Sequence, residues 1–260
     1  MAWPPQFLFL STLGVLLLAF PCRLPAQKPS AHEQFFFDSA NRERAVQNLP
    51  LLTWDSALAE AARRHALLMA KQDKLAHQLP GELPLDQRVG QAGGRFTQVG
   101  ENIAMGPQAP AIHRGWMESP GHRANILDAH FTALGVGVVE ENGELYSVED
   151  FSVAVASLGI DAQEEKVAAL LAAKGVRVSR DRATARKLCA DEPASAEHRS
   201  MLVLSYEAPD ISTLPDPVAR RIRDSGYRQA SVGACEPRDD GTGIPRFRIT
   251  VVLFPGAGAK

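Results

Sequence analysis

Side chains that could bind a metal ion or move a proton are concentrated between residues 77 and 130. They are His77, Glu101, His130 and one of Glu118 or His122. Each lies where a predicted helix ends or a loop begins, and such positions let polar groups converge over a rigid base. These residues are therefore the candidate site.

The same side chains allow three kinds of chemistry. His77 and His130, with carboxylates nearby, could ligate a divalent metal, for which zinc is favoured. His77, Glu101 and His130 could instead act in acid–base catalysis, since histidine titrates near neutrality. A His–Glu hydrogen-bond network that only holds the loops is the third possibility. The chain contains no H-E-x-x-H, C-x-x-C or G-x-S-x-G pattern, so spacing leaves all three open.

Composition and charge exclude one class of partner. The 260 residues carry 28 Lys and Arg against 30 Asp and Glu, a formal net charge of -2. This balance gives no electrostatic case for nucleic-acid binding. Arginine-rich stretches at 177–187 and 220–228 alternate with apolar or acidic residues, which favours solvated helix faces.

The N-terminus predicts export. An apolar run over Phe7–Phe20 is too short for a membrane span and suits a signal peptide over residues 1–26, cleaved after Ala26. Met1–Gln6 contains no Lys or Arg, so an uncleaved anchor is the alternative. A lipid anchor on Cys22 is disfavoured by the large residues before it. We expect residues 27–32 to be a mobile mature N-terminus, with no transmembrane segment after cleavage.

Removal of the signal peptide leaves two cysteines, Cys189 and Cys235. In an oxidising compartment two cysteines of one domain are a candidate disulfide. Two unrelated buried thiols are the alternative.

Residues 33–158 are predicted to form one domain with helices and a β-hairpin. Asp55 or Thr53 is suited to cap the second helix, and His65 inside it is predicted to be a packed structural histidine. Asn142-Gly143 is a strong hairpin signal. The expected helices are 33–48, 55–74, 85–90, 111–118 and one that begins at Ser119-Pro120; the expected extended segments are 51–54, 97–103, 134–140 and 144–156.

Residues 159–260 are predicted to be a smaller α+β domain of unknown function. Gly175 and Gly226 end two of its helices. The expected helices are 163–174, 183–190 and 215–225, and the expected strands are 177–179, 201–206, 227–235 and 246–254.

Several motifs in order resemble the CAP superfamily of cysteine-rich secretory, antigen 5 and pathogenesis-related proteins, also called SCP-like extracellular proteins. The resemblance covers about residues 33–156 and is of the bacterial type. Its motifs are Asn41-x-x-Arg44, Leu52-Thr53-Trp54-Asp55, His77, Gly100-Glu101-Asn102-Ile103-Ala104, Trp116, Ser119–Leu127 and His130–Gly137.

The resemblance implies an α-β-α sandwich with a cleft that holds two histidines and two glutamates, which in some members bind zinc or another divalent metal. His77, Glu101 and His130 match three of the four. The second glutamate position falls on Ser119, while Glu118 is one residue early and would leave the cleft face of a helix. His122 is a possible substitute.

Four residues of these motifs are predicted to serve the scaffold. Trp116 is expected to anchor the core. Ser119 is expected to cap a helix, with Pro120 at the first helical position. Arg123 and Asn125 are expected to bind loop carbonyls or neighbouring side chains.

The resulting functional hypothesis is a secreted or periplasmic binding protein for a small hydrophobic or lipid-like ligand, acting in cell-envelope or host interaction. The incomplete tetrad favours binding over catalysis. One alternative is a metal-dependent, peptidase-like hydrolase that uses the same cleft. Another is a scaffold whose C-terminal domain binds a protein partner.

Overall fold

A computed structural model describes residues 28–191, 196–198, 201–238 and 244–255. The predicted signal peptide, including Cys22, lies outside the described residues. Within them, no helix has the length and apolar character needed to cross a membrane.

The first half of the chain folds around a four-stranded sheet with the strand order β1-β3-β4-β2. β1 runs parallel to β3, and the other neighbours are antiparallel. The predicted hairpin joins β3 to β4, and Asn142 and Gly143 both have the positive φ that its turn requires. The strands are β1 Thr53–Trp54, β2 Phe96–Gly106, β3 Ala133–Glu141 and β4 Glu144–Ala154.

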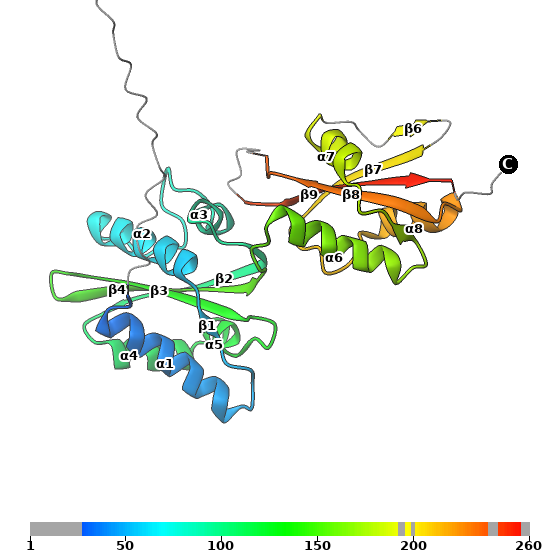
Figure 1. The fold of residues 1–260 in the computed structure, drawn as a ribbon. Helices are drawn as coiled ribbons and strands as arrows, with labels where there is room; N and C mark the ends of the chain where they lie inside the picture. Colours follow the sequence, from blue (N-terminus) through cyan, green and yellow to red (C-terminus); the bar gives the residue numbers. More distant parts are fainter. Residues whose placement is uncertain (1–27, 192–195, 199–200, 239–243, 256–260) are drawn as a thin grey trace, which may run out of the picture.

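Helices cover both faces of this sheet, which confirms the predicted α-β-α sandwich (Figure 1). α2 and α3 lie on one face, and α1, α4 and α5 lie on the other. β2 is one of the two edge strands and contacts α4 and α5. The helices are α1 Ala31–Val46, α2 Ser56–Gln72, α3 Leu85–Gln91, α4 Ala109–Glu118 and α5 Pro120–Leu127.

Polar caps set where the first two helices begin. Ser30 and Glu33 form a capping box, so α1 starts at Ala31, two residues before the predicted start. The Asp55 carboxylate accepts from the amides of Ala57 and Leu58 at the start of α2, as the sequence predicts.

Two glycines bring α2 against the middle of the sheet. A Cβ added to Gly135 would overlap the backbone of Ala59, and one added to Gly137 would overlap the backbone of Arg63. Only glycine permits this close approach of strand and helix. The spacing between β3 and α2 is therefore fixed by backbone contact.

The second half folds around a five-stranded sheet with the order β5-β8-β9-β7-β6. α7 covers one face and α6 and α8 cover the other (Figure 1). This is the predicted smaller α+β unit, with one strand, β6, that the sequence did not indicate. Its elements are α6 Ile160–Ala172, β5 Arg177–Val178, α7 Ala183–Ala190, β6 Ala196–His198, β7 Met201–Ala208, α8 Asp216–Ser225, β8 Gln229–Cys235 and β9 Phe247–Phe254.

The predicted disulfide is confirmed. Cys189 at the end of α7 is bonded to Cys235 at the end of β8. The bridge fixes α7 to the sheet across 46 residues of sequence. Near the junction of the two halves, the Arg95 guanidinium lies 4.7 Å from the centre of the Phe247 ring.

Candidate functional site

His77 and Glu101 are in direct contact, as the motifs predict. His77 lies in the loop after α2, and Glu101 lies on the edge strand β2. The His77 Nδ1 is 2.8 Å from Glu101 Oε1. The imidazole side chain is 61% exposed, whereas the carboxylate side chain is 3% exposed. A buried carboxylate thus orients an exposed imidazole, whose Nε2 stays free of that contact.

Arg88 on α3 binds the other oxygen of Glu101, with Nη2 2.6 Å from Oε2. The same guanidinium reaches Glu82 Oε1 at 3.2 Å through Nη1. His65 lies fully buried behind this pair, with its Nδ1 2.7 Å from Glu82 Oε1. We call His65, His77, Glu82, Arg88 and Glu101, together with Asp150, the buried ionic cluster.

Asp150 on β4 lies directly across the ladder from Glu101. Its side chain is fully buried, and neither of its oxygens has a hydrogen-bond partner among the described residues. Burial, and then the charge of Glu101, raise the pKa of Asp150 well above its usual range.

The environment favours a charged His77–Glu101 pair. The hydrogen bond to Glu101 raises the pKa of His77, and burial opposes this only in part. Burial pushes the pKa of Glu101 upward, but the hydrogen bond with His77 and the charges of Arg88 and His65 outweigh burial and leave it lowered. The contact with Glu101 therefore both orients the His77 ring and favours its charged form.

A second polar network lies where α5 meets β2. The Asn125 amide donates to Glu101 O at 3.1 Å and to Asn102 Oδ1 at 2.9 Å. The Asn102 amide donates to His122 O at 3.2 Å and to Glu149 Oε2 at 3.1 Å. Burial raises the pKa of Glu149 to about 8. Asn125 thus holds α5 against β2.

Two predicted site residues are not brought to the cluster. The His130 side chain is 82% exposed, and its Nδ1 lies 2.8 Å from Asp128 Oδ1, a residue of its own loop. Glu118 is exposed at the end of α4, and among the described contacts no hydrogen bond or ion pair joins it to His77 or Glu101. Among the described contacts none joins His130 to His77 or Glu101, so a tetrad that includes His130 stays a prediction.

Arg44 explains why the loop of His130 adopts its shape. The guanidinium is fully buried and donates to four backbone carbonyls, of Pro50, Ile126, Asp128 and Phe131, at 2.8 to 3.2 Å. The loop backbone is thereby held against α1. Within this loop the His130 ring hydrogen-bonds to the Asp128 carboxylate.

The expected scaffold residues differ in how they act. Trp116 is buried, and its Nε1 donates to Ile103 O at 3.2 Å. Ser119 occupies the cap position before Pro120, but its side chain makes no capping hydrogen bond, contrary to expectation. Arg123 is exposed on α5.

An apolar groove begins beside the cluster. It has a volume of about 470 Å³ and lies between the end of β2 and α4. His122 forms part of its wall; burial, and then the charge of His77, lower the pKa of His122. The groove is lined by Leu75, Ile103, Ala104, Met105, Gly106, Pro107, Ala111, Ile112, Gly115, Trp116, Ser119 and His122.

The donor set does not fit the metal site that the resemblance implies. Both oxygens of Glu101 are held, one by His77 and one by Arg88. Within the part of the chain that the structure describes, no three His, Cys, Asp or Glu side chains form a group able to hold a metal ion. In this arrangement a guanidinium supplies the positive charge beside the carboxylates.

Sequence reasoning missed most of the cluster. The sequence indicates Arg88 only as part of a short helix and His65 only as a packed histidine, and it gives Glu82 and Asp150 no role. The available signal was two consecutive acids, Glu149 and Asp150, inside a strand that is otherwise largely apolar. Acids at such positions are rarely buried without a partner.

Comparison with known proteins gives a family for part of the chain. Residues 37–155 match the model of the CAP family, described as the cysteine-rich secretory protein family. Over 112 residues the chain is 37% identical to "Uncharacterized protein YkwD" of Bacillus subtilis (strain 168), covering 43% of this chain and 44% of that protein. It is 36% identical over 107 residues to "Uncharacterized membrane protein YlbC" of the same organism, covering 41% and 31%.

One similar solved structure is an extracellular protein containing a SCP domain from Bacillus anthracis str. Ames. It has 35% identity and a TM-score of 0.44, over 46% of this chain and 40% of that chain. The chain thus spans less than half the length of the curated relatives it matches. Residues 37–155, less than half of the chain, thus match the cysteine-rich secretory protein (CAP) family.

Proposed function

We propose that residues 37–155 form an extracellular-type binding module whose groove beside β2 holds a small hydrophobic or lipid-like ligand. One observation carries the proposal: an apolar groove includes His122 in its wall, and His122 lies close enough to His77 for the two charges to interact. The groove walls are mostly aliphatic, with Trp116 and His122 as the ring side chains. Ligand sites commonly combine an apolar lining with a few placed polar groups.

The rim of the groove supports an apolar ligand. Leu75 and Met105 are 49% and 45% exposed, although both are large apolar side chains. Covering such surface stabilises a complex by about 25 cal/mol per Å². The flexible Met105 side chain adapts to ligands of different shape.

The polar end of the groove selects for a polar group on the ligand. Glu101 holds Nδ1 of His77 and so leaves Nε2 available to a hydroxyl or carbonyl group. The ligand that suits this arrangement has an apolar body and one hydrogen-bonding end. Long-chain alcohols are the simplest compounds of that kind.

An extracellular setting is part of the proposal. The apolar stretch over Phe7–Phe20 suits export, and the Cys189–Cys235 disulfide suits an oxidising compartment. Binding is favoured over metal-dependent hydrolysis because the Arg88 guanidinium already pairs with Glu101 Oε2, where its positive charge would oppose a metal ion.

The test is to block the groove without disturbing the fold. Gly115 lines the groove from inside α4, and a Cβ added there meets nothing within 4 Å. Gly115→Leu therefore fills the groove and also improves helix propensity. We expect wild-type protein to bind the neutral dye Nile red saturably, 1-dodecanol to displace it, and Gly115→Leu to lower the affinity at least about tenfold.

Gly121→Leu is the matched control. Gly121 is also helical and has nothing within 4 Å of an added Cβ, but it lies outside the groove lining. This variant should bind as the wild type does. Dye binding no higher than background, or equal loss in both variants, would refute the proposal.

A further inference from the structure

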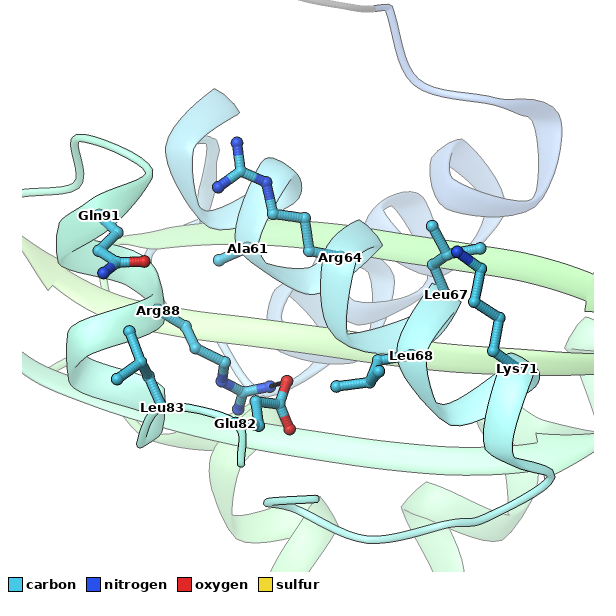
Figure 2. A pocket seen from close by; sticks show the side chains of 9 residues that line it. All are labelled: Ala61, Arg64, Leu67, Leu68, Lys71, Glu82, Leu83, Arg88 and Gln91. Carbon is cyan, nitrogen blue, oxygen red and sulfur yellow. Dashed lines mark hydrogen bonds and ion pairs between the residues drawn. The ribbon is translucent and has the colours of Figure 1, made fainter. Parts of the chain in front are cut away.

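A second cavity lies between α2 and α3, away from the groove. Its volume is about 280 Å³, and it shares no lining residue with the groove. We propose that this cavity is a binding site for a small aliphatic carboxylate. Its lining residues are Ala61, Arg64, Leu67, Leu68, Lys71, Glu82, Leu83, Arg88 and Gln91 (Figure 2).

The apolar part of the cavity comes from leucines on two elements. Leu67 and Leu68 project from α2, and Leu83 projects from the loop before α3 (Figure 2). Leu67 is among the exposed large apolar side chains of the protein. An aliphatic chain placed between these leucines removes apolar surface from water on both molecules.

The charged rim of the cavity favours an anion. Lys71 is exposed at the end of α2 and has no acidic partner among the described residues. Arg64 is paired with Glu60 at 2.8 Å, but both side chains are exposed, and such pairs are weak enough to exchange for a ligand.

The single acid in the lining does not offset these cations. Glu82 Oε1 already contacts His65 and Arg88, and its Oε2 accepts from the Leu79 amide. Its charge is therefore matched inside the protein. The adjacent Arg88 is 8% exposed, and its Nε is buried with no acceptor among the described residues. Arg88 is therefore committed to Glu82 and Glu101, and Arg64 and Lys71 are the lining cations with which a ligand carboxylate can pair.

The geometry sets which part of the ligand goes where. Leu68 and Leu83 lie on either side of Arg88 and Glu82, whereas Arg64 and Lys71 lie along one exposed face of α2 (Figure 2). A carboxylate at that face leaves its chain directed over Leu68 and Leu83. Chains of roughly six to ten carbons suit a cavity at the small end of the ligand-site range.

Octanoate is the probe, and octylammonium is the charge-reversed control with the same chain. Binding is measured by calorimetry and by the leucine methyl signals in NMR spectra of the full chain. We expect octanoate to bind saturably, to shift the Leu67, Leu68 and Leu83 methyl signals, and to bind at least tenfold more tightly than octylammonium.

Two variants test the site itself. Lys71→Glu should lower octanoate affinity at least fivefold, whereas Lys74→Glu, an exposed lysine outside the lining, should leave it unchanged. Leu67→Trp should fill the cavity and abolish binding, with folding confirmed by circular dichroism. Gly115→Leu should bind octanoate normally, so failure of the groove proposal leaves this one intact. Equal binding of octylammonium, or unaltered binding to Lys71→Glu, would overturn it.

Discussion

Each half of the molecule buries a carboxylate against arginine, but the two are completed differently. In the second half, Glu164 accepts from Arg186 at 2.7 Å, from Arg182 at 2.9 Å and from the Ala234 amide at 3.0 Å. In the first half, Glu101 accepts from Arg88 and contacts His77, while Asp150 beside it has no hydrogen-bond partner among the described residues.

The difference separates an ion cluster whose hydrogen bonds are satisfied from one that contains unsatisfied polar atoms. The pKa of Glu164 is lowered because the hydrogen bonds from Arg186, the Ala234 amide and Arg182 outweigh burial. The buried ionic cluster holds three carboxylates against one arginine and ends in an exposed histidine. Buried polar groups left without partners are costly, so they identify positions at which a ligand or proton can act.

Among the substitutions that test this comparison, Arg88→Met is expected to have the largest effect on the free energy of unfolding. It leaves Glu82 and Glu101 buried without their shared cation, which should cost about 3–5 kcal/mol of unfolding free energy. Arg186→Met should cost only about 1 kcal/mol, because that side chain is partly exposed and Arg182 remains. Urea unfolding followed by circular dichroism measures both. Equal losses would mean that the two clusters are energetically alike.

Removal of the disulfide should weaken the second half alone. The double variant Cys189→Ser/Cys235→Ser should lose about 2–4 kcal/mol of unfolding free energy, since a bridge across tens of residues restricts the unfolded chain. Far-ultraviolet circular dichroism should report an earlier transition. Tryptophan fluorescence, which follows Trp54 and Trp116 of the first half, should keep its midpoint. A shifted fluorescence midpoint would show that the halves unfold as one unit.

Glu149→Gln should change how stability depends on pH. The pKa of Glu149 is raised by burial to about 8, above its value in the unfolded chain. Its contribution is therefore complete below about pH 4 and is lost as the pH rises toward 8, by up to about 1.4 kcal/mol per pH unit. Urea unfolding at pH 5, 6 and 7 should show a shallower decline in the variant.

Glu164→Gln is the comparison for that experiment. The pKa of Glu164 is lowered, so its contribution is present at neutral pH and lost as the pH falls through the folded pKa. This variant should leave the slope between pH 5 and pH 7 as in the wild type. A flatter slope in Glu164→Gln than in Glu149→Gln would contradict the assignment.

The smallest expected effect is on the titration of His77. Its pKa should lie above 6.5 in the wild type and return toward 6.5 in Glu101→Gln, because the hydrogen bond to the carboxylate is the main cause of the shift. The stabilisation it gives is complete below pH 6.5 and is lost as the pH rises through the folded pKa. NMR titration of the ring protons measures this.

Glu60→Gln is the matched control for His77, since Glu60 is exposed and pairs only with Arg64 in the described contacts. The His77 pKa should be the same in this variant as in the wild type. An unchanged His77 pKa in Glu101→Gln would show that the carboxylate does not set the titration.

Local signals in the sequence predicted most elements of the fold. α7 has the predicted bounds, and the starts of α2 and β4 match because Asp55 and Asn142-Gly143 act on adjacent residues. β6 was missed because it has only three residues and is defined by its pairing with β7 rather than by a signal of its own.

The site was predicted only in part because ion pairs between distant residues leave no periodic signal. His77 and Glu101 were identified through motifs, whereas Arg88 looked like any arginine on a short helix. Arg182 and Arg186 were predicted to lie on a solvated face, although both bind the buried Glu164. His130 was assigned to the site by motif, but its ring hydrogen-bonds to Asp128, two residues earlier.

The close approach at Gly135 and Gly137 determines which wall of the α2–α3 cavity can yield. At these two glycines α2 contacts the backbone of β3 directly, so α2 cannot move closer to the sheet there. α3 is a helix of seven residues and meets the sheet through side chains such as Val89. A molecule would therefore enter and leave the cavity by displacement of α3, while α2 stays in place.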